Sequence, residues 1–339
     1  LYQKGFGYAD IDNQIPYTPQ HLQNIGSISK TFIGVSLQQA VDQGLLTWDT
    51  PINEVLPFQV IHPDYPDQPI LLSHLASHTA GINDGDDYDF SYSLTESNTY
   101  TDSDLDPDDV AEFEVYAENP DYELGEFCRA FLHKDGQLYS SDHFLDTAPG
   151  EVYEYSNVGA ALAAYVLEQA SDMSFPQWTK THILEPLSMS SSGWSFDEVD
   201  MSRHAQLYYD RSQPLPRYTL ATYPDGGFIT SVEDLSRYLS AMIANYGAED
   251  NQLVKPGGLK AIMDNGVDDS DGGTYGYFWE TQESGYIGHS GGDPGIITLM
   301  FFDPMTKYGF ILFFNGYPSD DGTGINRILD LVTERVGQM

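Results

Sequence analysis

Positive charge is scarce in this sequence. Its 339 residues include 14 lysines and arginines against 52 aspartates and glutamates, so its formal net charge is −38. This excess disfavours binding to nucleic acid or to an anionic lipid surface, because like charges repel. It also keeps a protein surface hydrated, together with a self-repulsion that salt screens. We expect a secreted or periplasmic protein. Its acidity leaves two interpretations open, a halophilic protein from a salt-rich environment or an acidic protein from an ordinary environment.

Cysteine and long apolar runs are also nearly absent. The single cysteine, Cys128, excludes an internal disulfide framework and offers no pair for a zinc knuckle. No stretch approaches the roughly 18 consecutive apolar residues that a membrane-spanning helix needs. No signal peptide opens the chain, so we expect any export signal to have been removed or never present. The 40% hydrophobic content still suffices for a sizeable core, which predicts a globular protein. We expect it to have no membrane span, metal or cofactor.

Hydrophobic periodicity divides the chain into a helical middle and strand-rich ends. Apolar residues at helical spacing predict helices, and short apolar runs between turn residues predict strands. The predicted helices are 28–43, 71–77, 108–116, 125–133, 157–169, 232–245 and 324–336, and the predicted strands are 1–8, 286–289, 296–302 and 309–314. Ser231 is predicted to cap the helix that follows it. This order predicts an α+β fold, with a sheet-and-helix lobe (1–20 and 220–339) and a mostly helical lobe (21–219).

Aspartates crowd the segment 84–146, which we expect to be a long, solvated excursion from the helical lobe that carries one or two helices. Asp102, Asp104 and Asp106 alternate as they would in a calcium-binding loop. The sixth position of that loop is proline rather than glycine, however, and the twelfth is phenylalanine rather than glutamate. The sequence therefore favours a hydrated acidic face over a cation site.

A serine and a lysine stand at the start of the first long predicted helix, in the sequence Gly26-Ser27-Ile28-Ser29-Lys30. Residues three apart share a helix face, so the Ser27 hydroxyl and the Lys30 amine can meet. A serine hydroxyl is a poor nucleophile until a base takes its proton, and a desolvated lysine amine can serve as that base. Serine is also a favoured helix N-cap, and Ser-x-x-Lys occurs by chance. Taken alone, the spacing leaves both interpretations open.

A second polar segment, Tyr155-Ser156-Asn157, immediately precedes a predicted helix. A phenol can shuttle a proton between a nucleophile and a leaving group, and an amide can orient an amine. An ordinary turn with a helix-capping serine or asparagine explains the same residues. On its own, this segment favours the structural interpretation.

A third segment, 288–292, reads Gly-His-Ser-Gly-Gly and matches the G-x-S-x-G nucleophile elbow of α/β-hydrolases. That interpretation fails, because a strand follows instead of a helix and none of the nine histidines lies beyond His289. We expect instead a strand edge whose glycines let a substrate approach the backbone, with His289 facing the cleft.

In this order, the three segments resemble the signature of the serine β-lactamase and penicillin-binding protein superfamily: Ser-x-x-Lys, Tyr-x-Asn and His/Lys-Ser/Thr-Gly. Flanking segments are similar to its class C β-lactamase-related branch, namely 72–82, Pro149-Gly150, 185–189 and Gly226-Gly227-Phe228. This branch includes class C β-lactamases, D-alanyl-D-alanine carboxypeptidases, D-aminopeptidases and lactamase-like esterases. The resemblance implies an antiparallel sheet flanked by helices, an inserted helical lobe and an active site between them. Within 72–82, we expect His78 to be a structural hydrogen-bonding residue.

The resemblance also implies a catalytic role for four side chains. Ser27 would be the nucleophile that becomes acylated. Lys30 and Tyr155 would share its proton as a coupled pair, either of which could be the formal base. Asn157 would position the Lys30 amine and the substrate amide. The implied reaction is hydrolysis of an amide or ester through an acyl-enzyme.

The substrate side of the implied site is the strand edge His289, Ser290, Gly291 and Gly292. The backbone N–H of Gly292 would form an oxyanion hole with that of Ser27. His289 stands where β-lactamases usually carry lysine, and imidazole supplies a positive charge only partly near neutral pH. This difference leads away from efficient β-lactamase activity. We expect D-amino-acid peptides as substrates (carboxypeptidase or D-peptidase-like), with small esters next and β-lactams third.

One alternative belongs to another functional class. A penicillin-binding or sensor protein would form an adduct without turnover, but the presence of Ser27, Lys30 and Tyr155 together argues against it. The N-terminus also departs from the resemblance, since family members usually have a helix and a strand before the segment that matches 4–8. We expect these elements either to be missing from this chain or to be replaced by another segment.

Overall fold

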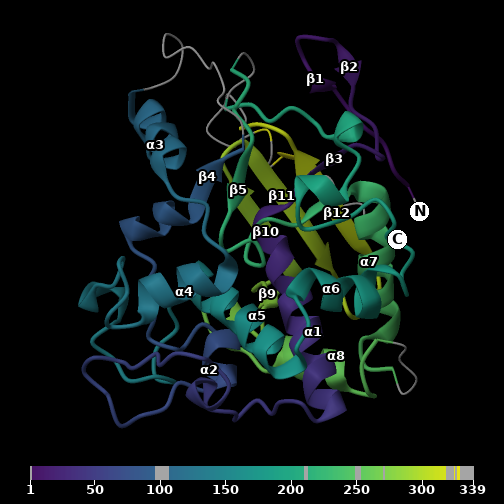
Figure 1. Cartoon of the computed structure of the whole chain (residues 1–339). Helices are drawn as coiled ribbons and strands as arrows, with labels where there is room; N and C mark the ends of the chain where they lie inside the picture. Colours follow the sequence, from purple (N-terminus) through teal and green to yellow (C-terminus); the bar gives the residue numbers. More distant parts are fainter. Residues whose placement is uncertain are drawn as a thin grey trace.

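A six-stranded antiparallel sheet lies inside the molecule, with helices on both sides of it (Figure 1). The structure is a computed structural model that describes residues 2–95, 107–209, 213–248, 253–269 and 272–317, with positions 324, 327 and 328. The strands lie in the order β12-β11-β10-β9-β8-β7. They are β7 (Val267–Asp268), β8 (Thr274–Tyr275), β9 (Glu280–Thr281), β10 (Ile287–Asp293), β11 (Ile296–Phe302) and β12 (Gly309–Phe314). The predicted strands 296–302 and 309–314 coincide with β11 and β12.

Strand β10 joins two predicted pieces, the apolar run 286–289 and the strand edge 288–292. Its pairing with β11 continues through two glycines to Asp293, which lies opposite Ile296. The turn Pro294-Gly295 joins the two strands, and Gly295 has a φ of +73°, a left-handed conformation that favours glycine. Because glycine is depleted in strands, the apolar run alone indicated only the first part of this strand.

Helices form most of the rest of the fold, and α1 runs through the middle of the molecule (Figure 1). It ends at Gly44, whose φ of +77° closes the helix where the sequence predicted. Ser231 caps α7 by accepting a hydrogen bond from the backbone N–H of Asp234, as predicted. The α-helices of the described residues are α1 (Lys30–Gln43), α2 (Leu72–Ala76), α3 (Pro107–Glu118), α4 (Leu124–Leu132), α5 (Asn157–Ser171), α6 (Phe175–Thr179), α7 (Val232–Asn245) and α8 (Gly258–Asp264).

The main hydrophobic core surrounds α1. Every residue from Lys30 to Ala40 is buried. Phe32 stacks on Tyr238 of α7 with ring centroids 4.1 Å apart, and it contacts Phe228 at 4.5 Å. Removing a buried aromatic side chain of this kind typically costs about 3–5 kcal/mol of folding free energy. The helix that begins at Lys30 is therefore held on all sides.

Three short strand pairs lie outside the large sheet, and the last two of them connect segments that are distant in sequence. They are β1 (Tyr8–Asp10) with β2 (Ile15–Pro16), β3 (Leu22–Asn24) with β6 (Ile229–Ser231), and β4 (Tyr92–Leu94) with β5 (Tyr218–Leu220). The predicted strand 1–8 is wrong for the described residues, because only Tyr8 belongs to a strand. A strand needs a ladder of hydrogen bonds to a neighbour, and the one such backbone bond of 2–7 in the described part of the chain runs from the N–H of Tyr17 to the carbonyl of Gly7.

The acidic excursion 84–146 is anchored by aromatic packing. It contains α3 and α4 close to the helices predicted there, together with β4. Phe113 and Tyr116 of α3 are buried, and the Tyr116 ring stacks on Tyr92 with centroids 4.5 Å apart. Tyr218 of β5 belongs to the same cluster. The excursion is thus less solvated than its aspartates suggested, because its rings form a second small core.

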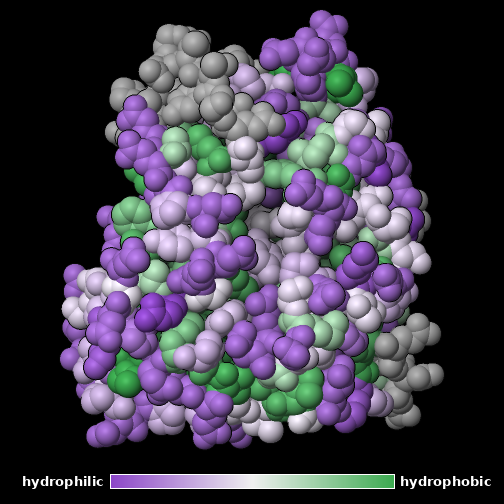
Figure 2. Space-filling view, in the orientation of Figure 1, coloured by the Kyte–Doolittle hydropathy of each residue, from purple (hydrophilic) through white to green (hydrophobic). Residues whose placement is uncertain are grey.

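Two findings concern only the residues that the structure describes. There, no helix is long and apolar enough to cross a bilayer, and no cluster of three or more His, Cys, Asp or Glu side chains is arranged to hold a metal ion. Asp102, Asp104 and Asp106 lie outside the described residues, as does most of the predicted helix 324–336. Figure 2 shows one face of the molecule, on which hydrophilic residues surround smaller hydrophobic patches. The two predicted lobes and their boundaries stay a prediction.

Candidate active site

The turn that carries Ser27 is pressed against strand β10. Ser27 lies in a 3₁₀ turn, Gly26–Ser29, directly before α1, and it is the one partly exposed residue of that turn. Gly26 has a φ of +54°, and a Cβ atom at this position would lie 3.1 Å from the backbone nitrogen of Gly292. Glycine therefore suits both the left-handed backbone and the close approach. The turn brings the serine and the glycine end of β10 together, as the family resemblance implied.

The Lys30 amine lies beside the Ser27 hydroxyl. Its Nζ is 3.1 Å from Ser27 Oγ, and it also donates to Asn157 Oδ1 at 2.6 Å and to the backbone carbonyl of Asp225 at 2.8 Å. The Lys30 side chain is fully buried. Burial lowers the pKa of Lys30 to about 8, although the carboxylates of Asp225, Asp84 and Asp293 act in the opposite direction. The amine thus titrates close to physiological pH.

Tyr155 completes the predicted group of three side chains. Its ring centroid lies 4.9 Å from the Lys30 Nζ atom. The Tyr155 hydroxyl is buried and has no hydrogen bond of good geometry within the described part of the chain. Burial raises the pKa of Tyr155 well above its usual range, and the nearby Ser27 side chain acts in the opposite direction. This phenol is therefore protonated at neutral pH.

His289 differs from its sequence-based prediction. The prediction gave this imidazole a partial positive charge and a position facing the cleft, but its side chain is buried. Its Nδ1 lies 2.5 Å from the carbonyl of Ser290, which can only accept, so Nδ1 carries the proton. Its Nε2 then accepts from the Tyr275 hydroxyl at 2.6 Å. Burial lowers the pKa of His289 to about 3, with a smaller contribution from Lys30, so the ring is neutral near pH 7.

The remaining predicted residues alternate along β10. Ser290 and Gly292 are exposed, whereas Gly291 is buried. A Cβ atom on Gly291 would lie 2.2 Å from the backbone oxygen of Ile25, but one on Gly292 would meet no atom within 4 Å. Gly291 therefore permits the close packing behind Ser27, and Gly292 borders open space. This arrangement puts the Gly292 backbone nitrogen beside the nucleophile turn.

Sequence reasoning missed three residues of the site. The Asp225 carboxylate is buried, accepts a hydrogen bond from Tyr88, and has its pKa raised by burial to about 7. Tyr275 is the partner of His289. Asp84 accepts hydrogen bonds at the start of α5. None of these contacts leaves a local spacing signal, although Asp84 closely follows the segment 72–82 that carried part of the resemblance.

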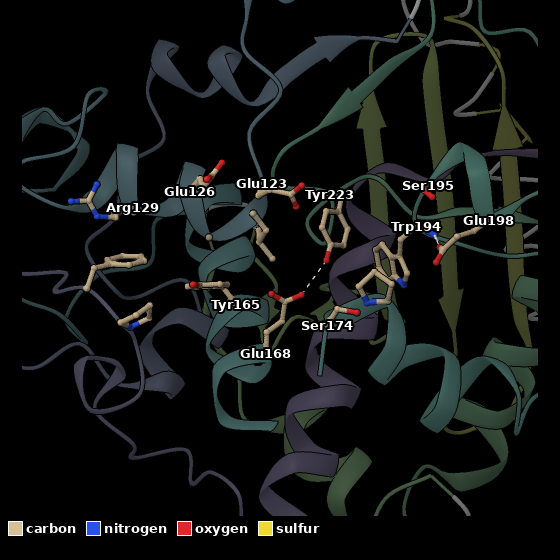
Figure 3. Close-up of a pocket in the computed structure, with 15 residues that line it drawn as sticks. Glu123, Glu126, Arg129, Tyr165, Glu168, Ser174, Trp194, Ser195, Glu198 and Tyr223 are labelled. Atoms are coloured by element: carbon tan, nitrogen blue, oxygen red, sulfur yellow. Dashed lines mark hydrogen bonds between the residues drawn. The ribbon is translucent and has the colours of Figure 1, made fainter. Parts of the chain in front are cut away.

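Two described cavities lie away from Ser27. One has a volume of about 620 Å³, and Figure 3 shows Glu168 and Tyr223 pointing toward each other within it. Their hydrogen bond joins the Tyr223 hydroxyl to the Glu168 carboxylate at 3.3 Å. The other cavity has about 480 Å³ and shares Trp194 and Tyr223 with the first. Neither cavity is lined by Ser27, Lys30 or Tyr155. Ser27 is partly exposed outside both cavities.

Comparison with solved structures supports the fold. A penicillin-binding protein homologue from Pyrococcus abyssi superimposes with a TM-score of 0.74 and 26% identity, over 94% of this chain and 68% of that one. D-amino acid amidase from Ochrobactrum anthropi SV3, in complex with L-phenylalanine, gives a TM-score of 0.71 and 22% identity, over 98% of this chain and 88% of the amidase. A class C β-lactamase gives a TM-score of 0.65 and 19% identity, over 93% and 83% of the two chains.

Sequence comparison also finds a penicillin-binding protein among the relatives of this chain. Penicillin-binding protein 4* of Bacillus subtilis (strain 168) is 25% identical over 320 residues, which are 88% of this chain and 62% of that protein. Protein flp of Staphylococcus aureus (strain MW2) is 22% identical over 318 residues, which are 92% and 56% of the two chains. This chain therefore spans roughly three fifths of the length of these curated relatives. Residues 1–334 match the β-lactamase family, and the α+β fold and the predicted resemblance are confirmed. The chain belongs to the β-lactamase family, a family of serine hydrolases.

Proposed function

We propose that this chain hydrolyses amide or ester bonds through an acyl-enzyme on Ser27, with amides and short peptides of D-amino acids as its preferred substrates. The observation that carries the proposal is the position of a fully buried amine 3.1 Å from a partly exposed serine hydroxyl. A serine becomes a useful nucleophile when such a base is within hydrogen-bonding distance.

Lys30 is the base in this proposal. With a pKa of about 8, about a tenth of the amine is neutral at pH 7. A neutral amine has two protons and one lone pair. The two protons are donated to Asn157 Oδ1 and to the carbonyl of Asp225, so the lone pair faces Ser27 Oγ. The raised pKa of Tyr155 makes this phenol a poor base, so it serves as a proton donor.

Acylation begins with attack by the Ser27 oxygen. The Ser27 oxygen attacks the substrate carbonyl carbon while its proton moves to Lys30. The bond from that carbon to the leaving nitrogen or oxygen breaks, and the leaving group takes a proton through Tyr155, which Lys30 reprotonates. In the second half-reaction a water molecule attacks the acyl carbon and gives a proton to Lys30. The bond from that carbon to Ser27 Oγ then breaks, Ser27 takes the proton from Lys30, and the carboxylic acid product leaves. The backbone N–H groups of Ser27 and Gly292 stabilise the oxyanion, and losing one such donor typically costs 10²–10³ in rate.

The neutral His289 supports the choice of substrate class. A substrate with a carboxylate at this edge, such as a β-lactam or a C-terminal D-alanine, is best recognised by a permanent cation. His289 with a pKa of about 3 supplies none at neutral pH. We therefore place D-amino-acid amides first, together with D-amino-acid peptides that put no carboxylate at this edge, with esters next and β-lactams third. The fold similarity to a D-amino acid amidase is consistent with this order.

A substrate panel tests the proposal. D-phenylalanine amide, L-phenylalanine amide, a D-alanyl-D-alanine peptide, a p-nitrophenyl ester and a chromogenic cephalosporin are compared at low and high salt, with Ser27→Ala as the control. We expect turnover of the D-amide above that of its L-enantiomer and of the cephalosporin, and complete loss in the control. Turnover of the D-alanyl-D-alanine peptide alone would reassign the substrate. A permanent fluorescent-penicillin adduct without any turnover would instead identify a sensor.

A further inference from the structure

The first turn of α5 has its backbone N–H groups fully paired. The first N–H groups of a helix have no partner within the helix and need external acceptors. Here the N–H of Ser156 donates to His78 Nδ1 at 3.1 Å, and that of Gly159 donates to the Ser156 hydroxyl oxygen at 2.8 Å. The N–H groups of Asn157 and Val158 donate to a residue far away in sequence. Every N–H from 156 to 159 is thus accounted for.

That distant residue is Asp84. One of its carboxylate oxygens accepts from the N–H of Asn157 at 2.5 Å, and the other accepts from the N–H of Val158 at 3.1 Å and from the Ser156 hydroxyl at 2.6 Å. Two oxygens therefore serve three donors. A negative charge at a helix N-terminus is also favoured by the helix dipole. Only a carboxylate can accept from all of these groups, since the asparagine amide has a single acceptor oxygen.

The segment held by Asp84 carries catalytic groups of the proposed reaction. Asn157 donates its backbone N–H to Asp84, and its side-chain oxygen accepts from the Lys30 amine at 2.6 Å. Tyr155 immediately precedes the capping Ser156, and its ring packs on His78 with centroids 4.4 Å apart. Two hydrogen bonds thus connect Asp84 to the amine that lies beside Ser27.

We propose that Asp84 is a positioning residue for acyl transfer: it fixes the segment 155–157 so that Asn157 holds the Lys30 amine against the Ser27 hydroxyl. This inference rests on the proposed function and assigns Asp84 no contact with substrate. The same carboxylate acts on Lys30 through charge, together with Asp225 and Asp293, in a direction that raises the pKa of the amine. His78 also faces Lys30, and burial keeps the pKa of His78 well below its usual value, so the ring is neutral.

The test compares Asp84→Asn with Asp84→Glu and with Asp86→Asn. The last is a matched control, because Asp86 is an exposed acid two residues farther along the chain. For Asp84→Asn we expect kcat on the preferred amide to fall by about 10- to 100-fold, the usual effect of losing a supporting contact, with KM changed less than threefold. Asp86→Asn should match the wild type. Assays run well below the melting temperature of each variant, so that unfolding does not contribute.

The pH profile separates positioning from a purely structural role. Loss of the negative charge lowers the pKa of Lys30, so the acid limb of kcat/KM should move to lower pH in Asp84→Asn. Asp84→Glu keeps the charge, so its limb should stay in place while kcat recovers in part. A folded Asp84→Asn variant with wild-type kcat, or with an unshifted limb, would overturn the inference.

A measurement without turnover keeps the two proposals distinguishable. The ¹³Cε signal of Lys30, assigned by comparison with Lys30→Arg, is titrated by NMR in the wild type and in Asp84→Asn. A lower pKa in Asp84→Asn supports the inference even if no substrate is found, and an identical titration contradicts it. Failure of the wild type to label with a fluorophosphonate probe, or labelling that persists in Ser27→Ala, would instead refute the proposed function.

Discussion

The surroundings of Lys30 and of His289, two regions of one site, differ in the charges that face a buried base. Both side chains are almost completely buried, and burial lowers the pKa of both. Lys30 faces the carboxylates of Asp225, Asp84 and Asp293, which hold its pKa at about 8. His289 faces a tyrosine hydroxyl, a carbonyl and the lysine, and its pKa falls to about 3. Equal burial thus yields one group that can exchange protons at neutral pH and one that cannot.

The comparison shows that the charges facing a buried group decide whether it can exchange protons at neutral pH. Desolvation alone would favour the neutral form of either base. The neighbouring carboxylates keep the pKa of Lys30 near neutral pH, which the proposed role of this amine as a base requires. His289 is left as a fixed hydrogen-bond acceptor for Tyr275. Changes to either set of neighbours test this distinction.

The largest effect is expected from Lys30→Ala. This variant removes the base and leaves the acceptor oxygens of Asn157 and Asp225 without their donor. We expect kcat/KM to fall at least about 10³-fold, as it does when a member of a nucleophile–base pair is removed. Steady-state hydrolysis of the preferred substrate measures the loss, with circular dichroism as the folding control. Residual activity within tenfold of the wild type would show that Tyr155, not Lys30, is the base.

A smaller effect is expected from Asp225→Asn. The Asp225 carboxylate raises the pKa of Lys30, so its removal lowers that pKa and increases the neutral fraction of the amine below pH 8. The acid limb of kcat/KM should move to lower pH, and each unit of movement raises the rate on that limb about tenfold. The backbone carbonyl that contacts Lys30 is retained. A limb that moves to higher pH would contradict the electrostatic account of this region.

The smallest effect concerns stability and His289→Asn. The pKa of His289 is about 3 in the folded chain and about 6.5 in an unfolded one. Above pH 6.5 neither state is protonated; between 6.5 and 3 only the unfolded state binds the proton, so stability falls as the pH falls. The wild type should lose up to about 1.4 kcal/mol of unfolding free energy per pH unit more than the variant. Urea unfolding at pH 6.5, 5.5 and 4.5 measures this, and parallel losses would show that the histidine is not buried in its neutral form.

Some of the site could be predicted because its signals are local. Ser27 and Lys30 are three residues apart at a helix start, and that spacing alone brings the two side chains to one face. The caps at Ser231 and Gly44 are also local, so the ends of α7 and α1 were placed correctly. Tyr155 depended on a family resemblance, because nothing in its own neighbourhood specifies its distance from a residue 125 positions away by number.

The rest could not be predicted, because it depends on long-range contacts. Asp84 meets Asn157 across 73 positions, and Lys30 meets the carbonyl of Asp225 across 195, with no periodic signal in either case. The charge of His289 depends on burial and on the Tyr275 hydroxyl, which composition does not reveal. The strand predicted for 1–8 failed because an extended pattern specifies no partner. The assigned catalytic roles and the lobe boundaries stay predictions.

The spacing of open and closed positions along β10 sets limits on how this site can be re-engineered. A methyl group on Gly291 would collide with the chain behind the nucleophile, and one on Gly288 would lie 1.9 Å from the oxygen of Met300. Position 292 has free space, and Ser290 projects outward. Laboratory evolution of selectivity should therefore concentrate its diversity on 290 and 292, where new side chains would meet incoming molecules without disturbing the serine.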